Sequence, residues 1–361
     1  MKSLKNITLQ AGEKAFVKIK DAGLSPDDVQ VMAGAAGGPK WLILAHLDRY
    51  LFGRWFADRK PPLFLVGSSI GAWRFAAASQ KSPVNAIDRL EQAYVHQTYD
   101  ASPSPAVVTS EAAKILNVMI GDCGDDEILS HPCFRLNIMT VRSKALTRQD
   151  GKGTLLPGLL LAAMSNLVSR NSLKLFFERA LFYDCRNRPP FYEMNQFPIH
   201  RVELSRKNIR LALMASGAIP LVMEGIRNIP NAPAGTFRDG GVIDYHLDIP
   251  FLNPNDNDGI VLYTHFVKQI IPGWLDKKLF WRRPSSAHLK NVLLVSPSRH
   301  FLDRLPYQKI PDRNDFYLFR NRDAERIAYW KTAVAMGREM ADEFMEAVDS
   351  GRIRDHIRPI L

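Results

Sequence analysis

Short runs of consecutive apolar residues, and longer segments in which apolar residues recur every three or four positions, predict strands and helices along this chain. A short apolar run is typical of a buried strand, whereas the longer period is typical of a helix with one buried face. The expected strands cover residues 29–33, 63–66, 134–141, 259–266 and 291–296. The expected helices cover residues 41–52, 72–78, 84–97, 109–120, 154–183 with an interruption at 169–172, and 323–348.

Composition agrees with a folded protein that has a large core. The chain has 361 residues, enough for one large domain or two, and its apolar share of 46% and charged share of 24% are ordinary for a globular protein. The net charge of +11 is compatible with binding to nucleic acid or to an anionic membrane surface, and it is equally compatible with a role in solubility alone. Because no basic run and no helix-turn-helix, zinc-finger or RNP-like pattern occurs, we do not expect nucleic acid as a partner.

The cysteines and the N-terminal residues bear on location. The chain has three cysteines, an odd number, and their spacing is not that of a metal site: Cys123, Cys133 and Cys185. We therefore expect a reducing compartment, and we expect neither disulfides nor a metal centre. The first twenty residues contain lysines but no apolar stretch typical of a secretory signal. The most apolar stretch, residues 155–164, is too short to span a bilayer. We therefore expect a cytoplasmic protein.

The segment 62–79 carries the first candidate for chemistry. The apolar run at 63–66 leads into Gly67-Ser68-Ser69-Ile70-Gly71, which is followed by the small residues of an expected helix. This order of strand, G-x-S-x-G and helix is the arrangement of a nucleophile elbow. The glycines allow a sharp turn, and Ser69 then lies at a helix N-terminus, which favours a developing negative charge. Ser69 is therefore the candidate nucleophile.

A glycine-rich loop, residues 34–40, lies between the strand expected at 29–33 and the helix expected at 41–52. It is not a P-loop, because Pro39 separates Gly38 from Lys40 and Trp41 stands where that motif needs a hydroxyl. Two interpretations remain. The loop is either a tight turn that needs glycine, or an oxyanion hole whose backbone N–H groups face a nearby anion.

A candidate for the base lies far downstream. Asp239 is followed by Gly240 and Gly241 and then by strand-forming residues, so its carboxylate is expected on a turn. Asp-Gly is commonly a hairpin turn without catalytic meaning, and both interpretations stay open at this stage.

Two further segments have alternative interpretations. The apolar stretch 154–183 is either a pair of core helices or an apolar wall or lid for an acyl chain. In residues 272–283 tryptophan and phenylalanine alternate with lysine and arginine, a mixture typical either of a membrane–water interface or of a solvated loop.

Taken in order, these motifs resemble those of the patatin-like phospholipases. The G-G-G-x-[RK]-G loop of that family is matched in part by residues 36–41, with Ala36 in place of the first glycine and Trp41 in place of the last. Its G-x-S-x-G is matched by residues 67–71 and its D-G-[GA] by residues 239–241. Residues 215–220 resemble its A-S-x-A-x-P segment.

The resemblance implies an α/β fold, in which a central, mostly parallel sheet is flanked by helices in three layers. The resemblance covers about residues 29–250, which we expect to form the catalytic core. Residues 1–28 are then an N-terminal segment, and residues 251–361 a C-terminal extension that completes the same domain. Within that extension the aromatic and basic residues of 272–283 predict a membrane-docking loop.

The activity implied by the resemblance is that of a lipid acyl hydrolase. Ser69 would be the nucleophile, Asp239 its base, and the N–H groups of Gly37 and Gly38 the oxyanion hole. A phospholipid or another acyl-ester lipid would be cleaved through an acyl-enzyme without metal or organic cofactor, and the protein would contact anionic membranes peripherally.

Two alternatives remain open. One is an α/β-hydrolase esterase whose Ser-Asp-His triad takes its base from His246 or His265. The other is a membrane-associating module that keeps the fold but has lost the chemistry.

Overall fold

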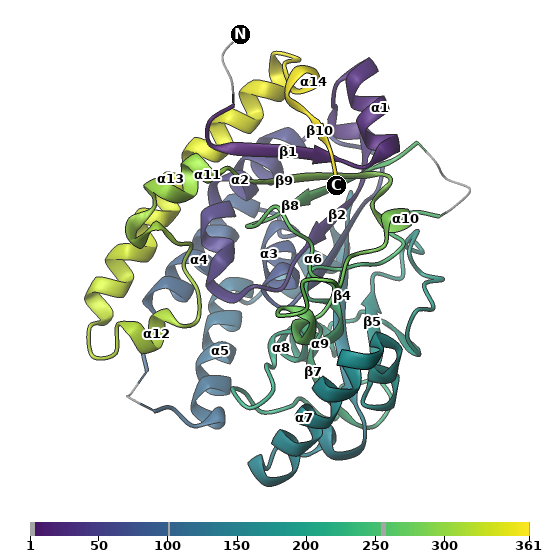
Figure 1. Ribbon diagram of the computed structural model, residues 1–361, viewed down its shortest axis with the longest axis vertical. Coiled ribbons are helices and arrows are strands. Elements are labelled where there is room, and N and C mark those ends of the chain that lie inside the picture. Colours follow the sequence, from purple (N-terminus) through teal and green to yellow (C-terminus); the bar gives the residue numbers. More distant parts are fainter. Residues whose placement is uncertain (1–3, 100–101, 254–257, 361) are drawn as a thin grey trace.

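The computed structural model describes residues 4–99, 102–253 and 258–360. Within these residues one ten-stranded sheet, whose strands are mostly parallel, is flanked by helices (Figure 1). The strands are β1 (Ile7–Ala11), β2 (Val29–Gly34), β3 (Leu63–Ser68), β4 (Phe134–Ser143), β5 (Phe177–Tyr183), β6 (Ile199–Glu203), β7 (Thr236–Asp239), β8 (Ile260–Thr264), β9 (Val292–Pro297) and β10 (Arg358–Pro359). The expected fold class is therefore confirmed.

The strand order in the sheet is β10-β1-β9-β8-β2-β3-β4-β5-β6, and β7 pairs with β4 outside this path. The antiparallel pairs are β1 with β9, β4 with β5 and β4 with β7. β8, β2, β3 and the first half of β4 run parallel at the centre, and their carboxyl ends therefore meet at one edge of the sheet. Binding sites in open α/β sheets lie at that edge.

The helices fill the connections between the strands and cover the sheet. They are α1 (Glu13–Ala22), α2 (Ala45–Tyr50), α3 (Ile70–Ala78), α4 (Pro83–His96), α5 (Pro105–Ile120), α6 (Gly124–Ser130), α7 (Lys152–Val168), α8 (Ile209–Gly217), α9 (Gly241–Asp244), α10 (Ser286–Leu289), α11 (Arg299–Arg304), α12 (Asp315–Leu318), α13 (Asp323–Asp349) and α14 (Ile353–His356). α13 packs on α2 and on the 3₁₀ segment Gly38–Leu44 that precedes it. No helix among the described residues is both long and apolar enough to cross a membrane.

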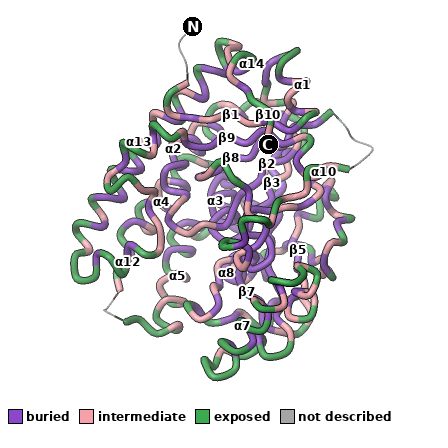
Figure 2. Tube along the Cα trace, viewed as in Figure 1, coloured by how far each residue is buried: buried purple, intermediate pink, exposed green. Residues whose placement is uncertain are grey.

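α3 lies at the centre of the molecule. It contacts β2, β3 and β4 on one side and α4 and α8 on the other, and every one of its residues is buried (Figure 2). Its one charged residue, Arg74, is paired with the buried Asp48 at 2.6 Å, and a helix whose other side chains are apolar on all sides is stable only when it is surrounded. Its run of alanines lets the neighbouring elements approach closely, so the residue at its N-terminus is held in a rigid environment.

Both ends of the described chain belong to the same sheet. β1 lies between β9 and β10, with Ile7 beside Pro297 and Gln10 beside Arg358. The Glu343 carboxylate on α13 accepts hydrogen bonds from the backbone N–H groups of Lys5, Asn6 and Ile7, at 2.7, 2.6 and 2.9 Å. These contacts fix the N-terminal strand to the last long helix.

Most of the elements expected from the pattern are present. The strands expected at 29–33, 63–66, 134–141, 259–266 and 291–296 are β2, β3, β4, β8 and β9. The helices expected at 84–97, 109–120 and 323–348 are α4, α5 and α13. β1 and α1, at residues 7–11 and 13–22, lie in the N-terminal segment, where the sequence shows no clear pattern.

One expectation is wrong. Residues 154–183 are not helical throughout, because α7 ends at Val168, a 3₁₀ segment covers Arg170–Leu175, and Phe177–Tyr183 is β5. β5 lies between β4 and β6 and is buried on both faces. Apart from Glu178 and Arg179 its residues are apolar or aromatic and do not alternate with polar ones, and periodicity alone does not distinguish such a strand from a buried helix.

Candidate active site

Ser69 and Asp239 meet because of the way three strands are paired. β3 is parallel to β4 and ends with Ser68 beside Met139. β7 is antiparallel to β4 and ends with Asp239 beside Thr140. β5 pairs with one edge of β4. The strands β3 and β7 therefore share the opposite edge of β4, where they approach each other end to end. Consecutive residues of β4 thus bring the two carboxyl ends together, across the 170 residues that separate Ser69 from Asp239.

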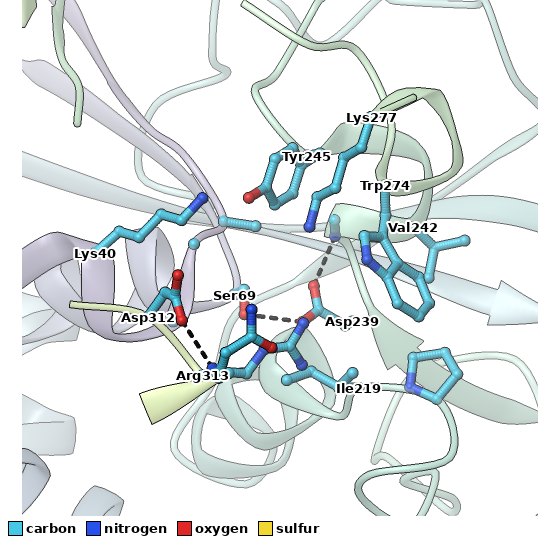
Figure 3. Close-up of a pocket in the computed structure, with 16 residues that line it drawn as sticks. Lys40, Ser69, Ile219, Asp239, Val242, Tyr245, Trp274, Lys277, Asp312 and Arg313 are labelled. Carbon is cyan, nitrogen blue, oxygen red and sulfur yellow. Dashed lines mark hydrogen bonds between the residues drawn. The ribbon is translucent and has the colours of Figure 1, made fainter. Parts of the chain in front are cut away.

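The two side chains are in direct contact. The Ser69 hydroxyl donates a hydrogen bond to Asp239 Oδ2, with 2.9 Å between the oxygens (Figure 3). Both residues are buried, and both line the same pocket. A serine hydroxyl bonded to a buried carboxylate is the geometry that a nucleophile and its base require.

The backbone at Ser69 is strained, and a hydrogen bond from its N–H group to a neighbouring side chain holds it in place. Its φ of 55° and ψ of −129° lie outside the regions that residues other than glycine normally adopt. The Ser69 N–H donates to the Ser216 hydroxyl oxygen at 2.8 Å, and the Ser216 hydroxyl donates to the Met139 carbonyl at 2.7 Å. Ser216, from the 215–220 segment, is therefore a positioning residue that ties the elbow to β4.

Gly71 allows the elbow to pack against the end of β2. A Cβ atom at this position would lie 2.1 Å from the carbonyl oxygen of Gly34, which is backbone and has no alternative rotamer. The first turn of α3 therefore rests directly on the glycine-rich loop, which keeps that loop beside Ser69.

The Asp239 carboxylate is oriented by a second hydrogen bond. Its Oδ1 accepts from the Gly241 N–H at 2.7 Å, so the residues after Asp239 start α9 and do not form a hairpin. Burial raises the pKa of the Asp239 carboxyl from its ordinary 3.8 to about 6, although the bonds from Gly241 and Ser69 oppose that shift. A carboxylate with a raised pKa is a stronger base for a hydroxyl proton.

The glycine-rich loop forms one wall of the pocket. The Ala36 N–H donates to the Tyr245 carbonyl at 2.9 Å, which anchors the start of the loop to the segment after Asp239. Gly38 has a φ of +56°, a conformation that glycine adopts at low cost. Among the residues that the structure describes, the N–H groups of Gly37 and Gly38 donate no hydrogen bond, and both residues line the pocket with Ser69.

Three cationic side chains surround the same pocket: Lys40, Lys277 and Arg313 (Figure 3). None of them forms an ion pair with any residue in the described part of the chain. The Lys277 ammonium lies 4.0 Å from the centre of the Tyr245 ring. Partial desolvation, together with the charges of Arg313 and Lys40, lowers the pKa of Lys277. The pocket therefore has positive charge that no neighbouring carboxylate neutralises by direct contact.

A second pocket of about 320 Å³ adjoins the first, whose volume is about 290 Å³. Ser69, Gly38 and Arg313 line both, so Ser69 stands at their junction. The second pocket is mainly apolar; its walls come from α3, α4, α5, residues 217–223 and the segment around α12. No residue of 154–183 belongs to the lining of either pocket, so these two pockets do not support the interpretation of that stretch as an acyl-chain wall.

His246 and His265 are buried close to each other, with ring centres 4.3 Å apart. Their Nδ1 atoms accept backbone N–H groups, from Ile271 at 2.9 Å and from Val267 at 3.0 Å. Burial lowers the pKa of both side chains, that of His265 to about 3. Neither ring has a hydrogen bond to Ser69 or to a carboxylate among the described residues.

Two of the three cationic residues of the pocket have no counterpart in the motifs. Lys277 lies within the stretch 272–283, whose mixture of aromatic and basic residues indicated a membrane interface. Arg313 lies in a polar segment with no recognisable pattern. No group of three or more His, Cys, Asp or Glu side chains within the described ranges is arranged to hold a metal ion.

No family model matches this chain, and a comparison with curated proteins gives no significant match either.

Proposed function

We propose that this protein is a serine acyl hydrolase that cleaves carboxylic esters of lipids, as its resemblance to the patatin-like phospholipases implies. The observation that carries the proposal is the 2.9 Å hydrogen bond from Ser69 to the buried Asp239 carboxylate, at the junction of two pockets. The N-terminus of α3 and the glycine N–H groups nearby supply the positive potential that an oxyanion needs.

Acylation begins when Asp239 takes the proton of the Ser69 hydroxyl as Oγ attacks the ester carbonyl. The negative charge that develops on the carbonyl oxygen is stabilised by the N–H groups of Gly37 and Gly38, and each such donor is typically worth about 10²–10³-fold in rate. Asp239 then gives its proton to the departing alcohol. This leaves an acyl group on Ser69.

Deacylation repeats these steps with water in place of the serine hydroxyl. Asp239 takes a proton from water, the resulting nucleophile attacks the acyl-enzyme, and the proton returns to Ser69 Oγ as the carboxylic acid leaves. Neither half-reaction requires a metal or an organic cofactor.

The two pockets suggest where the parts of the substrate bind. The apolar pocket, whose walls include Trp73, Ile115 and Met223, suits an acyl chain. The pocket with Lys40, Lys277 and Arg313 suits an alcohol leaving group that carries a phosphate. A phospholipid or lysophospholipid satisfies both requirements.

The histidine environment does not favour the triad alternative. A triad requires an imidazole that contacts the serine and is oriented by a carboxylate. Here the carboxylate itself contacts the serine, and the Nδ1 atoms of His246 and His265 are occupied by backbone N–H groups. We therefore propose the dyad.

Replacing Ser69 with Ala tests the proposal directly. The parent protein is expected to react covalently with a fluorophosphonate probe and to release fatty acid from a mixed lipid extract, as measured by mass spectrometry. The Ser69→Ala variant is expected to do neither, because it lacks the attacking oxygen. Ser68→Ala is the matched control: this neighbouring buried hydroxyl has no hydrogen-bond partner among the described residues, so its loss is expected to preserve labelling. A parent protein that takes up no probe would support the non-catalytic alternative.

Replacing Arg313 with Ala tests the assignment of the leaving-group pocket. We expect the KM for a lysophospholipid to rise about tenfold or more, because a hydrogen bond to a charged group is typically worth about 1.5–3 kcal/mol. The kcat/KM for an uncharged monoacylglycerol is expected to change little, and Arg313→Lys is expected to restore part of the difference. An equal loss on both substrates would contradict a role in binding the phosphate.

A further inference from the structure

The outer face of α7 is apolar and open to solvent. Its six outward-facing large side chains range in exposure from 46% at Leu156 to 91% at Val168. They are Leu156, Leu160, Leu161, Met164, Leu167 and Val168. The opposite face packs through Leu155, Leu159 and Ala162 into a small core of its own, separate from the main one. Single exposed apolar residues are common, but a continuous stripe of this size marks a contact surface.

A second segment extends this surface. The Arg282 guanidinium donates to the Asn166 carbonyl at 2.7 Å, and the Asn166 amide donates to Asp276 Oδ1 at 2.8 Å. These bonds fix residues 276–282 to the C-terminal part of α7. Phe280 and Trp281 are 79% and 53% exposed, with their rings edge to face at 4.9 Å. They and the six side chains of α7 are called the apolar face below. α7 projects at the lower end of the molecule in Figure 1, and Figure 2 shows it as largely exposed.

The two chain segments that carry the apolar face are rich in basic residues and poor in acidic ones. Residues 151–177 and 277–290 contain no aspartate or glutamate. Their lysines and arginines are Lys152, Arg170, Lys174, Lys277, Lys278, Arg282, Arg283 and Lys290. In the part of the chain that the structure describes, two carboxylates from outside these ranges contact them. Asp276 is buried and paired with Arg170 at 3.1 Å, and Asp248 is bonded to Ser285 and His288. Two copies of this chain would therefore bring like charges together, whereas an anionic bilayer surface offers the opposite sign.

We propose that the apolar face binds the surface of a negatively charged lipid bilayer. α7 would lie in the plane of the interface, with its leucines among the acyl chains and the surrounding lysines and arginines at the head groups. Trp281 adds an aromatic side chain of the kind enriched at this depth. The α7 stripe extends the surface well beyond the residues 272–283 that the sequence indicated.

The same segment reaches the candidate active site. Trp274 and Lys277 line the pocket that contains Ser69, while Phe280 and Trp281 belong to the apolar face. Trp274 also packs against the small core beneath α7. Binding to a bilayer through this face would hold the pocket close to the lipid surface. The inference itself does not depend on hydrolysis, because it concerns binding alone.

The test is co-sedimentation with vesicles of phosphatidylcholine, with and without phosphatidylglycerol. It uses the Ser69→Ala background so that no lipid is consumed. The protein is expected to bind vesicles with phosphatidylglycerol more tightly. The triple change Leu160→Gln, Met164→Gln and Leu167→Gln is expected to lower the partition coefficient at least about tenfold, because three large apolar side chains are removed from the contact. Glutamine keeps helix propensity high, so α7 is expected to persist.

A matched control separates this surface from general hydrophobicity. Val118 on α5 is 50% exposed, the same value as Leu161, and Val118→Gln is expected to leave vesicle binding unchanged. Unchanged binding by the triple variant would overturn the proposal. So would a parent protein that ignores vesicles but forms dimers that the triple variant dissociates, since the face would then be an interface between copies.

A second measurement covers the case in which the triple variant does not fold. The double variant Phe280→Ala, Trp281→Ala alters only exposed side chains, so it is expected to fold. We expect it to weaken binding to the vesicles severalfold. In the otherwise unchanged protein, brominated phospholipids are expected to quench part of the tryptophan emission, and that part is expected to disappear in Trp281→Ala. If brominated lipid quenches no Trp281-dependent emission in vesicles that bind the protein, this face does not contact the bilayer.

Discussion

Replacing Asp239 with Asn is expected to lower kcat by about 10²–10⁴-fold and, at the same time, to make the protein more stable near neutral pH. The loss of activity follows from the loss of the base that accepts the Ser69 proton. Asparagine has nearly the same shape, and its side-chain oxygen is expected to keep the hydrogen bond from the Gly241 N–H. The change therefore removes a charge without leaving a cavity.

The gain in stability follows from the raised pKa of the Asp239 carboxyl. Its pKa is about 6 in the folded protein and 3.8 ordinarily, so the folded state holds this proton more tightly than the unfolded state does. The stability that this proton supplies is fully present below pH 3.8 and is lost as the pH rises through about 6. Above that pH the buried carboxylate costs about 2–3 kcal/mol relative to its protonated form, and Asp239→Asn is expected to recover part of it.

Two measurements check this prediction. The kcat/KM of the parent is expected to fall about tenfold per pH unit below a midpoint near 6, as the base becomes protonated. Thermal unfolding is expected to show a higher midpoint for Asp239→Asn near neutral pH, with an advantage that shrinks as the pH falls below 6. Asp248→Asn is the matched control, because the Asp248 carboxylate contacts His288 and Ser285. Comparable loss of turnover in the control, with Asp239 dispensable, would contradict the assignment of the base.

Replacing Gly71 with Ala is expected to destabilise the folded protein more than any other single substitution discussed in this section. The added methyl group would lie 2.1 Å from the Gly34 carbonyl oxygen, so α3 must move away from the end of β2. Overpacking a rigid core typically costs about 1–3 kcal/mol, and here both partners are backbone, so we expect the upper part of that range. Because the same shift separates Ser69 from the glycine-rich loop, activity is expected to fall as well.

Gly153→Ala is the matched control for Gly71→Ala. It makes the same chemical change in the first turn of α7, where a Cβ atom would meet nothing within 4 Å. Alanine also has the higher helix propensity, so this variant is expected to be as stable as the parent or slightly more stable. Urea unfolding of both variants gives the comparison. If Gly71→Ala unfolds at the same urea concentration as Gly153→Ala, the contact with Gly34 does not constrain the elbow.

The fold class and the two residues of the candidate dyad could be predicted from the sequence because their signals are local. An apolar run, a glycine–serine turn and a small-residue helix lie within residues 62–79, and Asp239 with its two glycines forms an equally short pattern. Their contact depends on β4, whose register with β3 and β7 no short pattern encodes.

The rest of the site comes from elements without such signals. Arg313 reaches the pocket from the polar segment before α12, far from the motifs in sequence. Lys277 belongs to a stretch whose aromatic and basic residues are typical either of a membrane interface or of a solvated loop, and neither interpretation predicts that its side chain lines the pocket. The strand Phe177–Tyr183 was expected to be helical, since a strand buried on both faces lacks the alternation that identifies a half-exposed one.

The position of β1 has a consequence for biosynthesis. This strand is translated before the rest of the described sheet, whereas its partners β9 and β10 and the carboxylate of Glu343 come near the end of the described chain. While the polypeptide emerges from the ribosome, β1 therefore has α1 beside it but neither of its strand partners, and the sheet is completed only after residues 358–359 have left the exit tunnel. A nascent chain stalled before that point would leave β1 open to chaperones and proteases.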